Sequence, residues 1–79
     1  MVERILIVED EEEMRIVLNK ALTKKGYKVE EASDAESALK RLHQASFNVV
    51  ILDLRLPGMN GLDALHQIKT LDPDLVVII

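Results

Sequence analysis

The sequence predicts an α/β fold in which helices cover both faces of a parallel sheet. Three observations predict it: apolar runs rich in β-branched residues recur along the chain, segments with helical spacing separate them, and most of these runs are continuous rather than alternating. Continuous apolar runs are typical of parallel strands that are buried on both faces. The expected order is β-α-β-α-β-α-β, a doubly wound sheet without internal repeats or linkers.

The first half of the chain is expected to form two strands, each followed by a helix. Residues 4–10 form a strand that stops at the acids Glu9 and Asp10, and a helix follows until Gly26 ends it. Apolar residues at helical spacing define that helix: Met14, Val17, Leu18, Ala21 and Leu22. Residues 27–32 alternate in polarity, as an edge strand does. Ser33 and Glu36 then form a capping-box pattern at the start of a second helix.

The second half carries the most apolar interior strand, residues 47–53. Residues 54–61 contain two glycines, a proline and an asparagine, which predicts a loop. Asn60 is expected to cap a third helix that carries Leu62, Leu65, Ile68 and Leu71 at one-face spacing. Asp72 and Pro73 end that helix, and a fourth strand begins in residues 74–79.

Composition limits the classes of function. A chain of 79 residues holds one compact unit, residues 1–79, with a small core. The net charge of −4 argues against direct binding to nucleic acid or to an anionic membrane. The absence of cysteine excludes disulfides and thiol chemistry. The first residues lack the pattern of a signal peptide, so we expect a cytoplasmic protein.

Carboxylates follow two of the expected strands. Glu9 and Asp10 end the first, and Asp53 ends the third, directly after four apolar residues. If these strands are neighbours, three carboxylates converge at one sheet edge, where like charges require a cation, and hard oxygen ligands suit Mg²⁺. Asp53 could then be a nucleophile toward phosphorus, with the backbone carbonyl of Arg55 as a further ligand. Read alone, Asp53 could also be a strand end that faces water.

Two segments give the chain its resemblance to a known family. The first is residues 5–15, with the acidic pair Glu9 and Asp10, and the second is residues 49–65, with Asp53 and a loop at characteristic spacing. Four loop residues contribute: Pro57, Gly58, Met59 and Gly61. With these motifs the chain resembles the receiver domain of bacterial two-component response regulators. The resemblance spans the whole chain and implies a flavodoxin-like sheet with strand order 2-1-3-4.

The resemblance also implies roles for individual residues. Asp53 is the expected phosphoacceptor and Asp10 a direct Mg²⁺ ligand. Glu9 would help to bind the ion through water, and the Arg55 backbone carbonyl would be another ligand. The phosphoryl donor would be a sensor histidine kinase. The full-length protein would carry an output domain for transcription regulation, and the chain itself would not be classed as an enzyme.

The chain departs from the family pattern in two ways. Glu9 stands where the family most often has aspartate, which lengthens the reach to the metal. The family also has a Ser or Thr after the fourth strand and a Lys at the end of the fifth, and neither is in this sequence. We therefore expect a C-terminally incomplete receiver domain that lacks the fifth strand and the last two helices.

Two alternative functions remain open from the sequence. The chain could be a self-associating receiver fragment without competent switching, including a homodimer or a strand-exchanged oligomer. It could also be a Mg²⁺-dependent aspartyl-phosphate phosphatase, although such enzymes carry a second acid where this chain has Arg55. His43 and His66 are expected to be surface residues of helices, and Met14 is expected to pack. The side chain of Arg55 could pair with nearby acids or point to solvent.

Overall fold

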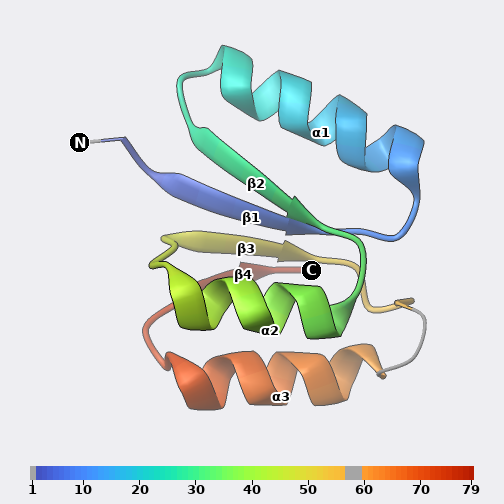
Figure 1. The fold of residues 1–79 in the computed structure, drawn as a ribbon, viewed down its shortest axis with the longest axis vertical. Helices are drawn as coiled ribbons and strands as arrows, with labels where there is room; N and C mark the ends of the chain where they lie inside the picture. Colours follow the sequence, from blue (N-terminus) through green and yellow to red (C-terminus); the bar gives the residue numbers. More distant parts are fainter. Residues whose placement is uncertain (1, 57–59) are drawn as a thin grey trace.

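A computed structural model describes residues 2–56 and 60–79 of the chain. Within them, four strands and three helices alternate as predicted (Figure 1). The elements are β1 (Arg4–Val8), α1 (Glu12–Lys24), β2 (Lys28–Ala32), α2 (Ala35–Gln44), β3 (Val49–Leu52), α3 (Gly61–Leu71) and β4 (Val76–Ile78). Pro57, Gly58 and Met59 of the expected loop lie outside the described residues.

The four strands form one parallel sheet in the order β2-β1-β3-β4. This is the order that the resemblance implied, and it places β2 at an edge, as the alternation of its residues predicted. Since β1 lies between β2 and β3, the first and third strands are direct neighbours. The carboxyl ends of all four strands therefore point to the same side of the molecule (Figure 1).

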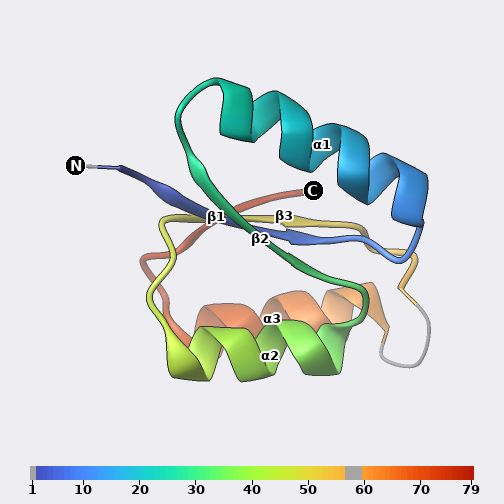
Figure 2. The ribbon, with the colours of Figure 1, turned by 45° about the horizontal axis from the view of Figure 1, so that its top comes forward.

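Helices cover both faces of the sheet, which confirms the predicted layers. Figure 2 shows α1 on one face and α2 with α3 on the other. The main core lies between the sheet and α2 and α3. Its most deeply buried members, each at most 1% exposed, are Leu6, Val8, Ala38, Val50, Leu52, Ala64 and Ile68. Because side chains alternate along a strand, Ile5 and Ile7 are buried on the opposite face, toward α1.

The helix α1 is less buried than its apolar pattern predicts. None of its residues is fully buried, and the side chains of Met14 and Val17 are exposed. The prediction that Met14 packs is therefore wrong for the described structure. Helical spacing identifies which side of a helix is apolar, but it does not determine whether a neighbour covers that side.

The ends of the helices follow the sequence closely, with one shift. Asp34, not Ser33, caps α2, and its side chain accepts a hydrogen bond of 2.7 Å from the backbone N–H of Ser37. Asn60 caps α3 as predicted, through a bond of 2.8 Å from the N–H of Leu62. The buried side of α3 is centred on Ala64 and Ile68, whereas Leu62 and Leu71 are exposed.

None of the helices in the described part of the chain is both long enough and apolar enough to cross a membrane.

Candidate functional site

The register of β1 and β3 brings the predicted acidic residues together. Val8 pairs with Leu52, so the residues that follow, Glu9 and Asp53, lie next to each other at the end of the sheet. The backbone N–H of Asp53 donates to the carbonyl of Val8 at 3.0 Å, and that of Glu9 donates to the carbonyl of Ala32 at 3.1 Å. Sheet hydrogen bonds therefore hold both acids at fixed backbone positions.

The carboxylates of Glu9, Asp10 and Asp53 form a cluster at this edge. One carboxylate oxygen from each residue lies within 4.8 Å of the others. Among residues 2–56 and 60–79, no other group of three or more His, Asp or Glu side chains is arranged in this way. The side chain of Asp53 is only 14% exposed, whereas Asp10 is exposed and Glu9 half-buried. The three predicted carboxylates thus surround one shallow depression.

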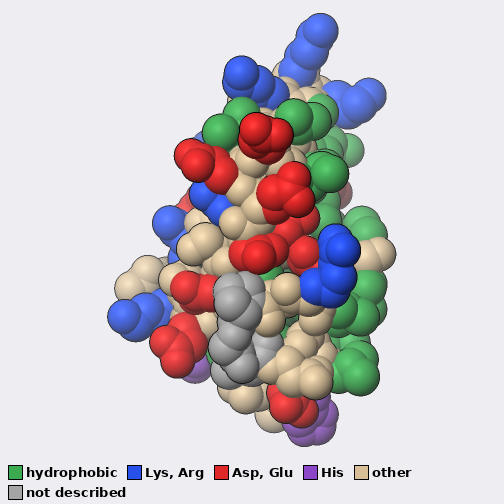
Figure 3. Space-filling model, turned by 90° about the vertical axis from the view of Figure 1, so that its right-hand side faces the viewer, with side chains coloured by type: hydrophobic (Ala, Val, Ile, Leu, Met, Phe, Trp, Pro, Cys, Tyr) green, Lys and Arg blue, Asp and Glu red, His purple; other side chains and the backbone are tan. Residues whose placement is uncertain are grey.

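Acidic side chains gather on the face that carries this depression (Figure 3). The residues that line it are Glu9, Asp10, Glu11, Asp53 and Arg55. Four of these five residues are acids, so the field at the depression favours a cation.

The environment shifts the pKa values of Glu9 and Asp53 in opposite directions. Burial raises the pKa of the Glu9 carboxyl, and its contact with the Asp53 carboxylate raises it further. The pKa of Asp53 lies below its usual value, chiefly because the backbone N–H of Arg55 donates a hydrogen bond of 2.9 Å to Asp53 Oδ1. Of the two carboxyl groups, Asp53 is therefore the one whose charged form its local contacts favour.

Arg55 contacts Asp53 through both its backbone and its side chain. Its Nε lies 3.4 Å from Asp53 Oδ1, while the side chain as a whole is 87% exposed. The Arg55 side chain therefore combines the two expected alternatives: it lies beside the Asp53 carboxylate and is also exposed to solvent. The role of its backbone carbonyl as a metal ligand stays a prediction.

The donor set fits a small divalent cation. Three carboxylates supply hard oxygen ligands, and the exposure of Asp10 leaves room for water to complete the coordination shell, which suits Mg²⁺.

Gly61 lets the loop after Asp53 pass close to the start of α3. A Cβ atom at this position would lie 2.3 Å from the backbone oxygen of Leu54. This close approach of two backbone segments therefore requires a glycine at position 61. Gly58 of the same loop lies outside the described residues.

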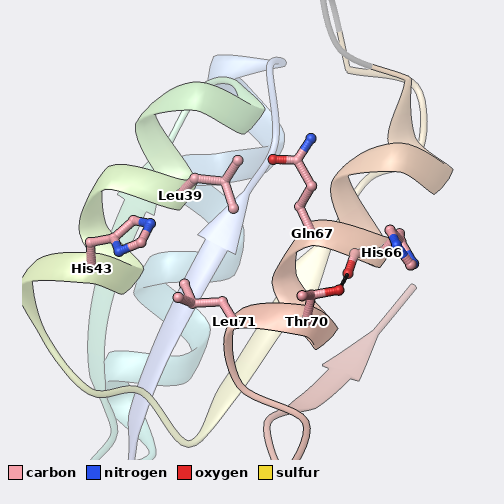
Figure 4. Close-up of a pocket in the computed structure, with 6 residues that line it drawn as sticks. All are labelled: Leu39, His43, His66, Gln67, Thr70 and Leu71. Atoms are coloured by element: carbon pink, nitrogen blue, oxygen red, sulfur yellow. Dashed lines mark hydrogen bonds between the residues drawn. The ribbon is translucent and has the colours of Figure 1, made fainter.

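The two histidines lie outside the acidic cluster. His43 and His66 are exposed on α2 and α3, as predicted, and they border a groove of about 420 Å³ between these helices. Figure 4 shows the two imidazole rings on opposite sides of the groove and not directed at one another, with Leu39 and Leu71 between them. This arrangement does not form a metal site from the two rings.

Sequence reasoning missed one residue that contacts the site. Arg15, in the first half of α1, donates from its guanidinium to the backbone carbonyl of Glu9 at 2.9 Å. The only signal in the sequence is a single basic residue that follows three consecutive glutamates, which could equally indicate a solvated helix face.

Comparison with known families and structures identifies the class of this domain. The model of the response regulator receiver domain matches residues 5–79, and the chain belongs to this family. Sporulation initiation phosphotransferase F of Bacillus subtilis is 38% identical over 79 residues, which cover 100% of this chain and 64% of the relative. The chain thus spans slightly less than two thirds of the length of that relative.

Solved structures agree with this assignment. The response regulator TrrA of Thermotoga maritima in complex with Mg²⁺ and BeF superposes with a TM-score of 0.91 at 34% identity, covering 96% of this chain and 66% of TrrA. TrrA in complex with the histidine kinase ThkA gives a TM-score of 0.90 with the same coverage. The flavodoxin-like fold implied by the sequence is confirmed for the four strands and three helices described.

Proposed function

We propose that the chain accepts a phosphoryl group on Asp53 from a sensor histidine kinase. The observation that carries this proposal is a largely buried Asp53 carboxylate within 4.8 Å of two further acids, at the carboxyl ends of neighbouring strands. Ligands of open parallel sheets bind at this edge, where the strand order reverses between β1 and β3. The histidine kinase bound to TrrA supports the choice of donor.

The same residues would hold Mg²⁺. Asp10 and Asp53 would bind the ion directly, Glu9 would do so through water, and the backbone carbonyl of Arg55 would add a ligand. Bound there, the ion would offset the negative charge of the carboxylates and of the incoming phosphoryl group. The Mg²⁺ bound to TrrA supports this proposal.

The transfer needs only one reactive group from this chain. A carboxylate oxygen of Asp53 attacks the phosphorus of the donor phosphohistidine and forms an acyl phosphate, while the P–N bond breaks and its electron pair returns to the imidazole of the kinase. The backbone N–H of Arg55 and the sheet bond to Val8 hold the nucleophile in place. The chain is thus a substrate of the kinase and a switch, rather than an enzyme.

We propose that phosphorylation controls an output domain outside this sequence, one for transcription regulation, as the family resemblance implies. The acidic charge of the chain gives no reason for it to contact DNA directly. A cytoplasmic location stays a prediction.

A second candidate role is self-association. In the described sheet β4 is an edge strand, and Val76, Ile78 and Ile79 expose more than half of their surface. An exposed apolar edge strand favours pairing with another chain, and a second copy of this chain supplies a matching edge. The alternative of an aspartyl-phosphate phosphatase is not favoured, because Arg55 occupies the position of the second acid.

The phosphoacceptor proposal is tested by intact mass after incubation with acetyl phosphate and Mg²⁺. We expect the mass of one phosphoryl group to be added to the protein, and to be lost in Asp53→Asn and after chelation of the metal. The matched control is Asp63→Asn, an exposed aspartate in the first turn of α3, which should be phosphorylated as the parent is. Equal phosphorylation of Asp53→Asn and the parent would contradict the assignment.

A further inference from the structure

A chain of polar contacts links α1 and β2 to the acidic cluster. Arg15 Nε donates to the carboxylate of Glu31 at 2.9 Å, and a second nitrogen of the same guanidinium donates to the carbonyl of Glu9 at 2.9 Å. The other oxygen of Glu31 accepts from the side-chain amide of Asn19. Asn19 in turn accepts from the hydroxyl of Thr23 at 2.8 Å. Both carboxylate oxygens of Glu31 are therefore engaged.

These contacts fix the peptide that joins two of the candidate metal ligands. The N–H of Glu9 is bound to the carbonyl of Ala32, and its own carbonyl is bound by Arg15. The Glu9–Asp10 peptide plane is thus held from the side of Glu9, although Asp10 itself is exposed and makes no strand pairing. Its orientation determines where the Asp10 carboxylate can lie relative to Asp53.

We propose that Arg15 is a positioning residue that holds Glu9 and Asp10 toward Asp53, and that Glu31 orients Arg15 for this task. This inference rests on the proposed Mg²⁺-dependent phosphoacceptor function. Arg15 is suited to the role because its planar guanidinium donates in two directions at once, and because its side chain is only 18% exposed. Groups that orient metal ligands typically change metal affinity by about 10-fold to 100-fold when they are removed.

A neighbouring ion pair provides a matched control. Arg41 of α2 donates to Glu30 at 2.8 Å, so it also joins a helix to β2, one residue away from Glu31. In the described structure Arg41 has no recorded bond to Glu9, Asp10 or Asp53, and its side chain is 43% exposed. Loss of Arg41 removes a pair of the same type without touching the acidic loop.

The experiment measures Mg²⁺ affinity by backbone amide shifts of Asp10 and Asp53 in the intact protein. We expect Arg15→Met to weaken Mg²⁺ binding about tenfold and Arg15→Lys to recover part of the loss, because an ammonium keeps the charge but not the forked geometry. Glu31→Gln should weaken binding less, and should add nothing in the Arg15→Met background. Arg41→Met should bind within twofold of the parent.

A second measurement needs no metal and separates this proposal from the proposed function. In the magnesium-free protein, the amide of Asp10 should become more mobile on the picosecond to nanosecond timescale in Arg15→Met, with the sheet amides unchanged. Binding within twofold of the parent and an equally ordered Asp10 in Arg15→Met would overturn the positioning role, as would an equal loss in Arg41→Met. If instead the parent binds no Mg²⁺, the proposed function fails. The mobility of the Asp10 amide in the magnesium-free protein then decides by itself whether Arg15 has the positioning role.

Discussion

The two faces of the sheet differ in how completely helices cover them. On the face under α2 and α3, the strand residues Leu6, Val8, Val50 and Leu52 are almost completely buried. On the face under α1, burial decreases from the centre toward β4: Ile7 is fully buried, its partner Ile51 on β3 is half-buried, and Ile78 on β4 is 52% exposed. One helix covers β1 and β2 but does not reach β4 (Figure 2).

This difference shows how the residues of the acidic cluster are held in position. Val8 and Leu52, which precede Glu9 and Asp53, point into the well-covered face and are at most 1% exposed. Asp53 is therefore anchored next to almost completely buried residues of the main core. Arg15 reaches the cluster from the other, sparsely covered face. The well-covered face anchors the strand ends before both Glu9 and Asp53, and the contact from Arg15 adds a second hold on the Glu9–Asp10 peptide.

The largest effect on the free energy of unfolding is expected when one residue from each face of the sheet is replaced by alanine. Leu6→Ala should lower the free energy of unfolding by about 2–5 kcal/mol, because it leaves a cavity in the main core. Ile78→Ala should cost about 1 kcal/mol or less, since the side chain is already half in water. Urea unfolding followed by far-ultraviolet circular dichroism measures both. Equal losses would show that the two faces contribute alike to stability.

The next effect concerns the loop that joins the covered face to α3. Gly61→Ala should cost about 1–3 kcal/mol, because the added Cβ would overlap with the backbone oxygen of Leu54. A shift of Leu54 also displaces Arg55, whose N–H holds Asp53, so phosphorylation by acetyl phosphate should slow. Ala64→Gly in the same helix is a control that alters stability without crowding this loop. Parent-like phosphorylation of a destabilised Gly61→Ala would contradict the positional argument.

Much of the fold and of the acidic cluster could be predicted from the sequence. The features that could not be predicted have physical explanations. The meeting of Glu9, Asp10 and Asp53 follows from a general property of parallel sheets, that strands carry their carboxyl ends to one edge. The exposure of Met14 could not be predicted, since periodicity does not say what covers a helix. The contact from Arg15 to Glu9 depends on a guanidinium rotamer, which no sequence pattern records.

The capping of α2 was displaced by one residue for a similar reason. Ser33 and Asp34 are both good capping residues, and the pattern of Ser33 with Glu36 favoured the first. The carboxylate of Asp34 is the one that accepts from the N–H of Ser37. Local hydrogen-bond geometry, rather than residue preference, decided between adjacent candidates.

Because Asp34 caps α2 through a carboxylate, we expect the free energy of unfolding to depend on pH, by about 1 kcal/mol. The bond from Ser37 lowers the pKa of Asp34 in the folded state, so its stabilisation is fully present above the unfolded value of about 3.9 and is lost as the pH falls through the lower folded value. Asp34→Asn keeps a capping oxygen but cannot titrate. The stability advantage of the parent over Asp34→Asn should therefore be constant above about pH 5 and should shrink as the pH falls below about 4. A difference independent of pH in urea unfolding would contradict the capping role of the charge.

The smallest effect on the folded monomer is expected at the open edge of the sparsely covered face. Ile78→Lys places a charge on an exposed edge strand, so it should change the free energy of unfolding by less than about 1 kcal/mol while weakening association between copies. Sedimentation velocity over a range of concentrations measures this, with Leu62→Lys as a control that makes the same type of change at an exposed residue of α3, on the opposite face (Figure 2). If the parent sediments as a monomer at all concentrations, the exposed edge of β4 does not drive self-association, and the second candidate role is wrong. If Ile78→Lys alone abolishes an oligomer, the uncovered face, and not the acidic end, is where copies of this chain meet.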